Sequence, residues 1–485
     1  MEKKSKIKIT ASLFFFLLTV TISQGIYSKI FIYPEEEYLV KKTELFLNKY
    51  NFSVDTTSFP ISYELLRNSK DRSYKDFGNL TSYISNFNEN FAPEFNNKLI
   101  LRAASNLISI RDINDNWKDS NSFSYSSNFK TKSFAGKINL TKVSSSISKK
   151  NYYLDGSYLS FTTLNNIFGI GVIDRWWGPS HQSNLIISNY SRPSPGVFLN
   201  SLKGLEFDNF LGIFGKINYS IFINKLEKNR MQSGAYLLGG RVTLIPIKSL
   251  TFGISRTLMF GGGNRPDDIS MFWKALIGDD NVDATTGEID PSNQLAGWDM
   301  KYDFSMNNLL VSPYIQIIGE DKNHGHFYIS KEIAILGIEL KFHKDDLLRA
   351  LTLEFSNTIG DFGLLYNVNY EHFNYKTGYR YRNLPIAAFT DNDSQFLSLK
   401  YLLEFNQRVL ISNSLFYGKL NKDKSGKNVW GNEGNKVVGI KSKIKYKLSK
   451  NISIESNIIF KDEKLIISNV PLDKNALNVI LEYNF

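Results

Sequence analysis

Apolar and polar residues alternate along much of this chain, with the period of two that is typical of β-strands. Residues 478–485 alternate in this way up to the terminal Phe485, and the same pattern recurs at 216–224, 298–305 and 452–458. Each segment predicts a strand with one apolar face and one polar face. Further candidate strands lie at 122–131, 134–143, 151–163, 236–245, 249–257, 351–356, 362–371, 396–404 and 408–417.

A polar face on so many strands favours a wide barrel with a polar lumen over a packed soluble sandwich. Periodicity alone leaves both architectures open, but the last strand, ending on Phe485, resembles the closing strand of bacterial outer-membrane barrels. The 26 Tyr and 36 Phe residues suit aromatic girdles at two membrane interfaces. We therefore predict a mainly β fold, a large antiparallel transmembrane β-barrel of about 16–18 strands, over residues 100–485.

Helical spacing replaces the alternation before the barrel. Residues 34–50, "PEEEYLVKKTELFLNKY", begin with a proline and three acids and carry lysines later, as the helix dipole favours. Residues 77–91 repeat apolar side chains at spacings of three and four, and 59–66 suggest a short helix between the two. A small N-terminal α-helical bundle is thus expected over residues 29–98.

The first 25 residues have the composition of a secretory signal peptide. Four lysines precede a short apolar run over 11–22, which is too short to span a bilayer. Cleavage is expected after Gly25 or Ser28. Export would place the barrel in the bacterial outer membrane and the helical bundle in the periplasm. The chain has no cysteine, which excludes disulfides, thiolate metal sites and an N-terminal lipoprotein anchor.

Composition and charge narrow the classes of partner. Mean hydropathy is −0.25 and no long apolar run is present, so helical membrane spans are not expected. The formal net charge of +11 falls to +8 when residues 1–25, with four lysines and one glutamate, are removed. This charge would attract an acidic polysaccharide or anionic lipid headgroups, and salt would weaken either attraction. Nucleic acid is disfavoured because no basic run or recognition motif is found.

The most unusual stretch is "DRWWGPSHQSNLIISN" at 174–189. Trp176 and Trp177 could belong to an interfacial aromatic belt that ends in a Gly-Pro turn. Alternatively, indole faces could stack on sugar rings while Arg175 and His181 hydrogen-bond hydroxyls or carboxylates, for which the arginine fork is well shaped.

This stretch, extended to "GIGVIDRWWGPSHQSNLIISNYSRPSPG" (169–196), resembles the signature of the Wzi-type capsule assembly proteins. Segments "FGGGNRP…FWKALIGDDN" (260–281), "PSNQLAGWDMKY" (291–302), "YIQIIGEDKN" (314–323) and "YKTGYRYRNLPIAAFTDNDSQFLSL" (375–399) agree in order. One departure is Ile386-Ala387-Ala388, where a histidine-containing "IGH" would be expected.

The resemblance implies an outer-membrane barrel that binds capsular or related polysaccharide like a lectin, without cofactor or catalysis, and helps to assemble capsule. It also implies contact with outer-membrane lipid and lipopolysaccharide, and with the barrel assembly machinery. Long loops at 261–294, with the helix-like "DISMFWKALIG", and at 380–395 are expected to be functional. The carbohydrate-binding residues predicted from the signature and these loops are Arg175, Trp176, Trp177, His181, Arg192, Arg265, Asp267, Trp273, Tyr379, Arg380 and Arg382.

Two other functions stay open at this point. A polar-lined barrel could be a substrate-selective, porin-like channel, unless a loop folds inward to close it. A hydrolase would need a nucleophile and a base in contact, but Ser180 and Ser183 are too close to His181 in sequence to form a triad readily. His324 and His326 have no obvious third metal ligand, and the paired acids, such as Asp267-Asp268, lie in loop-like sequence. The sequence therefore favours a binding protein over an enzyme.

Overall fold

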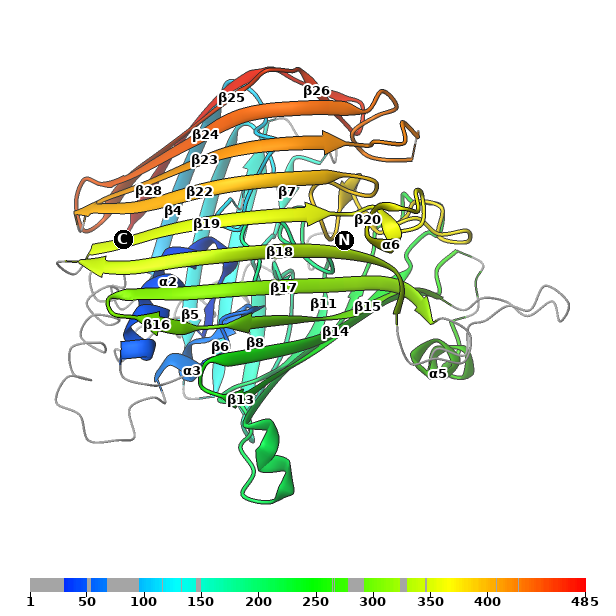
Figure 1. The fold of residues 1–485 in the computed structure, drawn as a ribbon, viewed down its shortest axis with the longest axis horizontal. Coiled ribbons are helices and arrows are strands. Elements are labelled where there is room, and N and C mark those ends of the chain that lie inside the picture. Colours follow the sequence, from blue (N-terminus) through cyan, green and yellow to red (C-terminus); the bar gives the residue numbers. More distant parts are fainter. Residues whose placement is uncertain are drawn as a thin grey trace, which may run out of the picture.

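A closed antiparallel β-barrel dominates the computed structural model (Figure 1). The structure describes residues 30–49, 54–67, 96–144 except 116 and 132, 150–277 except 264 and 266, 292–322, 329–344, 347–425 except 407, and 427–485. Twenty labelled strands close the barrel within these residues, but β7 and β8 pair with the same neighbour, β6, and β15 and β16 both pair with β17. Each of these two pairs is one interrupted strand, so the barrel has 18 strands.

The barrel strands in chain order are β4 (Asn96–Ala104), β5 (Ser122–Lys130), β6 (Phe134–Val143), β7 (Tyr152–Tyr153), β8 (Tyr158–Thr163), β9 (Asn166–Gly171), β11 (Gly196–Ser201), β12 (Lys216–Lys225), β13 (Tyr236–Ile247), β14 (Leu250–Phe260), β15 (Ser292–Tyr302), β16 (Phe304–Met306), β17 (Leu309–Lys322), β18 (Ile329–Lys344), β19 (Leu347–Asn357), β22 (Gln395–Asn406), β23 (Val409–Leu420), β24 (Asn435–Lys447), β25 (Ile452–Lys461) and β28 (Asn475–Asn484). The last strand, β28, pairs with the first, β4, and closes the cylinder.

Short strands and helices complete the structure. They are β1 (Phe31–Ile32), β2 (Ser58–Phe59), β3 (Ile61–Ser62), β10 (Trp176–Trp177), β20 (Arg380–Tyr381), β21 (Leu384–Pro385), β26 (Leu465–Ile467), β27 (Val470–Leu472), the 3₁₀ helices η1 (Pro34–Glu36) and η3 (Phe210–Phe214), and the α-helices α2 (Glu37–Lys49), α3 (Tyr63–Arg67), α5 (Ile269–Ile277) and α6 (Gly360–Gly363). Among the described residues, no helix is long and apolar enough to cross a membrane.

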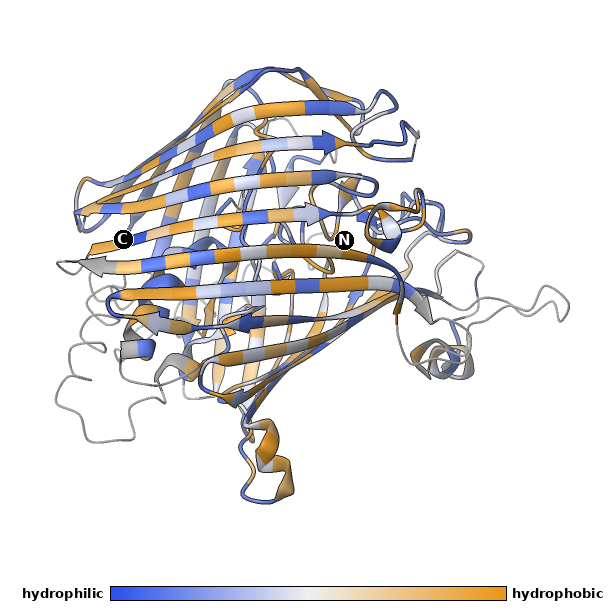
Figure 2. Cartoon of the chain, viewed as in Figure 1, coloured by the Kyte–Doolittle hydropathy of each residue, from blue (hydrophilic) through white to orange (hydrophobic). Residues whose placement is uncertain are grey.

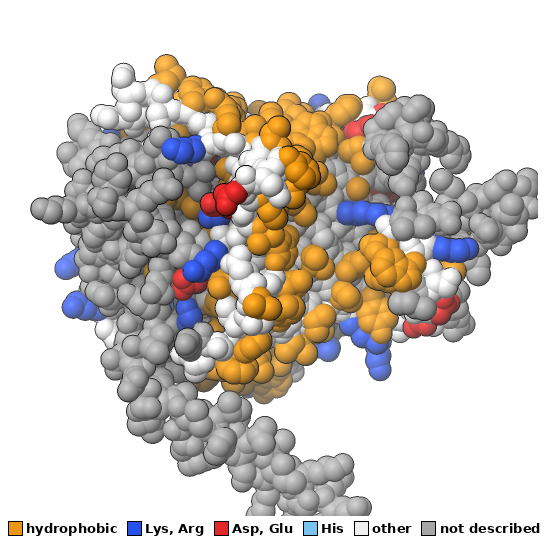
Figure 3. All heavy atoms as spheres, turned by 90° about the horizontal axis from the view of Figure 1, so that it is seen from below, with side chains coloured by type: hydrophobic (Ala, Val, Ile, Leu, Met, Phe, Trp, Pro, Cys, Tyr) orange, Lys and Arg blue, Asp and Glu red, His pale blue; other side chains and the backbone are white. Residues whose placement is uncertain are grey.

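The alternation in the sequence becomes an apolar outside and a polar inside. In β18, Leu336 faces outward and is 51% exposed, whereas Glu339 and Lys341 face inward and are fully buried. In β28, Val479 and Leu481 face outward and Asn478 faces inward, as the sequence predicts. Bands of alternating hydropathy run along the strands in Figure 2, and apolar side chains gather over the barrel face shown in Figure 3. This arrangement is that of a membrane-spanning barrel.

The two ends of the barrel differ. The C-terminus and α2 lie at one end, and the long connections that carry α5, α6 and β20 lie at the other (Figure 1). Outer-membrane barrels have short periplasmic turns and longer extracellular loops, so the long connections mark the extracellular end. Three of these connections contain buried stretches that fold into the lumen, and we call them the inward-folded segments: residues 105–121, 172–195 and 358–394.

The N-terminal residues 30–67 enter the lumen from the C-terminal end. Helix α2 places Lys42 2.7 Å from Glu404 of β22, and Glu44 2.7 Å from Lys341 of β18. Farther in, β1 pairs with β3, and β2 pairs with β10 of an inward-folded segment. The N-terminal residues and the extracellular connections therefore meet inside the barrel.

Most predicted elements are confirmed, including the helix that begins at Pro34 and the loop helix α5. The short helix predicted over 59–66 is confirmed only from Tyr63 onward, because β2 and β3 precede it at Ser58–Phe59 and Ile61–Ser62. The strand predicted over 362–371 is wrong. Asp361, Phe362 and Tyr370 have positive φ angles of 48°, 54° and 62°, which an extended strand does not allow. The predicted signal peptide and the helix at 77–91 lie outside the described residues, so the bundle over 29–98 stays a prediction.

The outward face provides a test of the membrane span. Leu353 lies in the middle of β19 and is 45% exposed on the outside, and Leu347 begins the same strand. We expect Leu353→Arg to lower the free energy of unfolding in lipid vesicles by about 2–4 kcal/mol, because the charge enters the bilayer midplane. Leu347→Arg, near the interface, should cost about 0–1 kcal/mol. Urea titrations of both variants check this, and equal losses would contradict the predicted depth.

Candidate functional site

The two adjacent tryptophans lie deep in the lumen. Strand β10 pairs antiparallel with β2, which sets Trp176 opposite Phe59 and Trp177 opposite Ser58. Trp176 is 2% exposed and Trp177 is fully buried. The Trp176 indole N–H donates to the carbonyl of Ser180 at 2.9 Å. Neither indole has a face open to a sugar ring in this structure, so the predicted stacking role does not fit Trp176 or Trp177.

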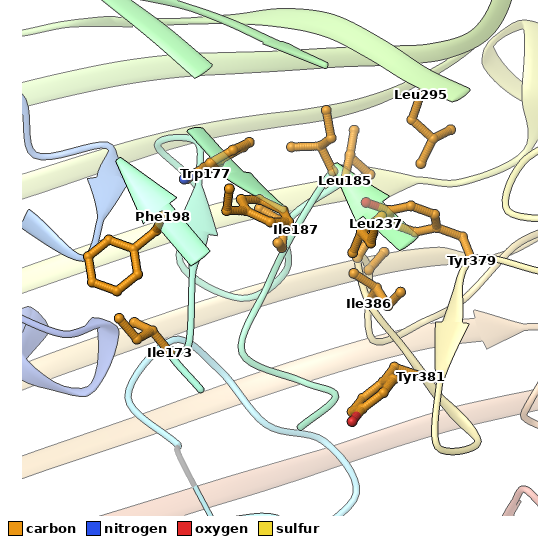
Figure 4. Packing of buried hydrophobic residues seen from close by; sticks show 14 of the residues in the cluster. Ile173, Trp177, Leu185, Ile187, Phe198, Leu237, Leu295, Tyr379, Tyr381 and Ile386 are labelled. Atoms are coloured by element: carbon orange, nitrogen blue, oxygen red, sulfur yellow. The ribbon is translucent and has the colours of Figure 1, made fainter. Parts of the chain in front are cut away.

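Apolar packing explains why these indoles lie beside charged residues. Trp177 packs on Phe222 of β12 with ring centroids 5.4 Å apart, and the Arg175 guanidinium lies 4.1 Å from the centroid of the same phenylalanine. Figure 4 shows Trp177, Leu185 and Ile187 of one inward-folded segment gathered in a cluster that also contains Ile386 and Tyr379 of another. The tryptophan motif therefore anchors the interior of the barrel.

Side chains of the barrel wall form hydrogen bonds with the backbone of the inward-folded segment 172–195. The Glu354 carboxylate of β19 accepts the N–H groups of His181 at 2.7 Å and of Gln182 and Ser183 at 3.2 Å. It also accepts the Tyr314 hydroxyl at 2.8 Å. A buried backbone without secondary structure needs such partners, since unpaired N–H groups are costly.

A second wall residue continues this role. Gln316 of β17 accepts the N–H of Leu185 at 2.9 Å and donates to the carbonyl of Trp177 at 2.8 Å. Gly178 has a φ of 142°, and a Cβ there would lie 2.5 Å from the Gln316 amide nitrogen. Only glycine fits this close approach without a shift, so the Gly-Pro turn is adapted to the wall.

His181 lies where the helix, the inward-folded segment and the wall meet. Its Nδ1 is 2.7 Å from Glu37 of α2, and its Nε2 is 3.5 Å from Glu339 of β18. These three residues could supply metal ligands, whose atoms lie within 4.8 Å of one another. Lys41, however, pairs with both Glu37 and Glu339. An ammonium group thus already neutralises these carboxylates, which favours an ion-pair junction over a metal centre.

Burial lowers the pKa of His181 to about 4, and the nearby Lys41 adds to this effect although Glu37 opposes it. The pKa of Glu37 lies well below its usual value, because Lys400 and Lys41 together outweigh the effect of burial. At neutral pH the junction therefore holds a neutral imidazole between charged partners.

The predicted arginines fall into two groups. Arg192 is 6% exposed and pairs with Asp119 and Asp155 while lying on the ring of Tyr153. Arg380 is equally buried and lies 2.6 Å from Glu371 and 2.8 Å from Asp391.

Arg382 is different, because it is only half-buried. Its guanidinium lies 5.6 Å from the Tyr153 centroid and 5.2 Å from that of Tyr381. Arg192 and Arg380 thus hold the interior together, whereas Arg382 reaches the surface.

Tyr379 is also an interior residue, 1% exposed, and its hydroxyl donates to Thr257 at 2.9 Å. The Ile386-Ala387-Ala388 stretch is buried below it, where the Ser188 hydroxyl donates to the carbonyl of Ala387 at 2.6 Å. The departure from the family pattern therefore lies in a packed position.

The remaining three predicted residues come from the β14–β15 connection. Arg265 is half-buried, 5.1 Å from the Tyr375 ring centroid, and Asp267 is exposed. Trp273 on α5 is 55% exposed. Helix α5 packs on Leu258 and Phe260 of β14, on the same strand face as the outward Ile254. The helical loop thus covers the outside of the barrel, and Trp273 is separated from the other predicted residues.

Hydrogen bonds join three extracellular connections into one surface. Arg230 donates to the carbonyl of Arg380 at 3.0 Å, Gln232 donates to that of Asn374 at 2.8 Å, and the Gly263 N–H donates to Ser233 at 2.8 Å. The connections 226–235, 261–267 and 372–382 therefore lie together. We name their accessible part the rim surface, which comprises Arg265, Asp267, Phe373, Lys376 and Arg382.

Sequence reasoning missed the wall residues Glu354, Gln316, Glu339 and the helix residue Glu37. The alternating pattern of the strands indicates that Glu354, Gln316 and Glu339 face the lumen. No local signal in the sequence identifies the residues with which they pair. Phe373, 86% exposed, was also missed, and it follows directly after residues 362–371, which were expected to form a strand.

The fold and the interior define a class: an outer-membrane β-barrel whose lumen holds both its N-terminal residues and inward-folded extracellular connections. The family model of "Capsule assembly protein Wzi" matches residues 61–464, and the chain belongs to this family.

Two known proteins are similar to this chain, the first in its fold and the second over part of its sequence. The structure of Wzi of Escherichia coli, an outer-membrane carbohydrate-binding β-barrel involved in group 1 capsule assembly, is 20% identical with a TM-score of 0.80, over 92% of this chain and 98% of that chain. A Klebsiella pneumoniae 55.8 kDa protein "in cps region" is 32% identical over 173 residues. That alignment covers 35% of this chain and 33% of the relative.

The packing of Trp177 leads to a stability prediction. We expect Trp177→Ala to lower the opening free energy of the 172–195 segment by about 3–5 kcal/mol, because a buried indole is replaced by a cavity. Amide hydrogen exchange at Leu185 and Ile187 reports this change. Trp273→Ala, on the outside of the barrel, is the control and should leave the same amides unaffected. Unchanged protection in Trp177→Ala would contradict the anchoring role.

The His181 junction leads to a pH prediction. When the 172–195 segment leaves the barrel interior, His181 has its usual pKa of 6.5. When the segment is docked in the lumen, the pKa of His181 is about 4. Docking of the segment should therefore weaken as pH falls from 6.5 to 4, by up to about 3 kcal/mol. This loss can be measured by following the rate of protease cleavage within the segment as the urea concentration is raised, once at pH 7.5 and once at pH 5. His181→Asn should remove this loss and leave the opposite dependence of Asp174, whose pKa burial raises to about 6. An equal loss in this variant would assign it to other groups.

Proposed function

We propose that this barrel binds capsular polysaccharide at its rim surface and helps to attach or assemble capsule on the cell exterior. Membership in the capsule assembly family supports this function, and Wzi of Escherichia coli is a carbohydrate-binding barrel. The observation that carries the proposal is a rim surface with two accessible arginines, Arg265 and Arg382, each beside a tyrosine ring.

Arg382 is the strongest candidate for a direct contact. Its backbone N–H donates to Glu227 at 3.2 Å, and its φ of 49° turns the chain sharply at this point. Tyr153 and Tyr381 hold the guanidinium by cation–π contact. This arrangement leaves N–H groups for a carboxylate or hydroxyls, which a planar guanidinium binds in a bidentate manner.

Exposed neighbours extend this surface. Phe373 provides an apolar face for the C–H side of a sugar, while Lys376 and Arg265 add positive charge. Asp267 can accept sugar hydroxyls. A polysaccharide with acidic residues would therefore fit best.

The interior argues against a porin-like channel. Segment 172–195 contacts β12, β17 and β19, and Asp112 and Asp115 of segment 105–121 pair with Lys441 of β24. These strands are distributed around the barrel, so the two segments extend across the lumen. A binding role without catalysis accords with this packing.

The outer surface has partners of its own in this proposal. The apolar band would contact membrane lipid, and α5 with its exposed Trp273 would contact lipopolysaccharide near the extracellular rim. The C-terminal strand β28 would be the element that the barrel assembly machinery recognises, and the N-terminal residues 30–67 would close the lumen at its periplasmic end.

We predict that Arg382→Ala weakens binding of purified capsular polysaccharide by about tenfold, since charge-assisted hydrogen bonds contribute about 1.5–3 kcal/mol each. Surface plasmon resonance with detergent-solubilised protein measures the change. The matched control is Arg349→Ala, because Arg349 lies on β19 away from the rim surface. Equal affinity in both variants would remove Arg382 from the binding surface, and no binding by wild-type protein would overturn the function.

A further inference from the structure

One connection at the periplasmic end of the barrel is much longer than its neighbours. The β8–β9 and β13–β14 turns at this end contain two residues each, 164–165 and 248–249, whereas the β11–β12 connection spans 14 residues, 202–215. It includes the 3₁₀ helix η3 (Phe210–Phe214), the green coil that projects from the wall below β13 in Figure 1. Periplasmic turns of outer-membrane barrels are usually short. The additional residues of this connection therefore point to a role beyond joining two strands.

The base of this connection is fixed to both neighbouring turns. The Asn165 side chain accepts the N–H of Lys203 at 3.0 Å and donates to the carbonyl of Gly204 at 2.8 Å. On the other side, Gly215 has a φ of 64° and lies so close to β13 that a Cβ would collide with the Ile245 carbonyl. The connection therefore leaves the barrel rim from a fixed base.

The tip of the connection is apolar and exposed. In η3, whose sequence is "FLGIF", Phe210 is 82% exposed, Ile213 is 74% exposed and Phe214 is also exposed, and no residue is charged. The Asn209 side chain caps η3 by accepting the N–H of Leu211 at 3.0 Å. The same coil is mostly coloured as hydrophobic in Figure 2. Apolar side chains that are so accessible to water mark a surface that contacts another apolar phase.

The neighbouring turns enlarge this apolar surface. Leu164 in the β8–β9 turn is 90% exposed, and Ile247 at the end of β13 is exposed as well. Along β12, the outward side chains Ile221 and Ile223 continue the apolar surface toward the middle of the membrane-facing band. We name the exposed apolar side chains at the periplasmic rim the interfacial patch, which comprises Leu164, Phe210, Ile213, Phe214 and Ile247.

Charged residues lie beside the tip rather than on it. The exposed charged residues of this connection and of the β13–β14 turn are Lys203, Glu206, Asp208 and Lys248. Lys216, where β12 begins, lies 3.8 Å from Glu206. A charged base next to an apolar tip is the distribution expected of a segment in the interface of a membrane, where headgroups meet acyl chains.

We propose that the interfacial patch inserts into the periplasmic leaflet of the outer membrane and that its partner is phospholipid. Acyl chains contact Phe210, Ile213 and Phe214 about 5–10 Å into the headgroup boundary, and headgroups surround the charged base. Lipid fits better than a second copy or a periplasmic protein, because the patch is continuous with the membrane-facing band and η3 projects sideways from the wall (Figure 1). This anchor lies at the opposite end from the rim surface and does not depend on polysaccharide binding.

Single nitroxide labels test the proposal, since the chain has no cysteine of its own. The labels are attached to Phe210→Cys and Ile213→Cys in the full-length chain, reconstituted in phospholipid vesicles. Leu353→Cys is the reference within the membrane-facing band, and Lys450→Cys is the matched control in the exposed β24–β25 turn at the same end. Electron paramagnetic resonance measures how often each label collides with oxygen, which concentrates among acyl chains, and with a water-soluble nickel complex.

We expect the ratio of oxygen to nickel collisions at Phe210→Cys and Ile213→Cys to be severalfold higher than at Lys450→Cys and to approach that at Leu353→Cys. Both positions are exposed, so the substitutions leave the interior packing intact, and heat-modifiable gel migration verifies folding. Ratios equal to that at Lys450→Cys would place the patch in water and overturn the proposal. Dipolar broadening between labels on two molecules carrying Ile213→Cys would assign the patch to a second copy and would also overturn it.

Discussion

Charged side chains that point into the lumen require partners, and the rest of the interior depends on this requirement. Glu339 and Lys341 are fully buried on the wall, where an unpaired charge would be very costly. They pair with each other at 2.8 Å, and α2 supplies a further partner to each: Glu44 lies 2.7 Å from Lys341, and Lys41 pairs with Glu339. On the other side of the barrel, Asp115 is shared by two lysines of β24. The wall therefore specifies which segments can fill it.

This constraint also links the interior to the extracellular surface. The connection that carries Arg382 descends into the lumen through Arg380, whose guanidinium is held by Glu371 and Asp391. The tryptophan motif packs beneath it and is bound to the wall through Glu354 and Gln316. A loop supported in this way loses little conformational freedom when a ligand binds, which favours recognition of a weakly held polymer. In the function proposed above, the motif would contribute to binding through this support, since its indoles are buried away from the surface.

The strands and several helices could be predicted, since their signals are local. Alternation in 478–485 and the acidic start of the helix at Pro34 depend on neighbouring residues only, and both are confirmed. The strand predicted at 362–371 failed although its apolar residues alternate. There the Asn367 backbone N–H donates to both carboxylate oxygens of Asp393 at 3.1 Å, and positive φ angles turn the chain, so distant contacts outweigh the local pattern. For the same reason, the sequence identified Arg382 as a candidate but did not distinguish it from the buried Arg192 and Arg380.

Taken alone, the sequence determined which side of each strand meets lipid and which meets the lumen, because side-chain direction in an extended backbone follows from position along the strand. It also indicated the family through the tryptophan motif. Only the tertiary structure decided what fills the lumen. Trp177 meets Phe222, and His181 meets Glu37 across 144 positions of sequence. Such pairings are set by the closure of the barrel and by the need to neutralise buried charge, and neither is encoded within a short stretch of residues.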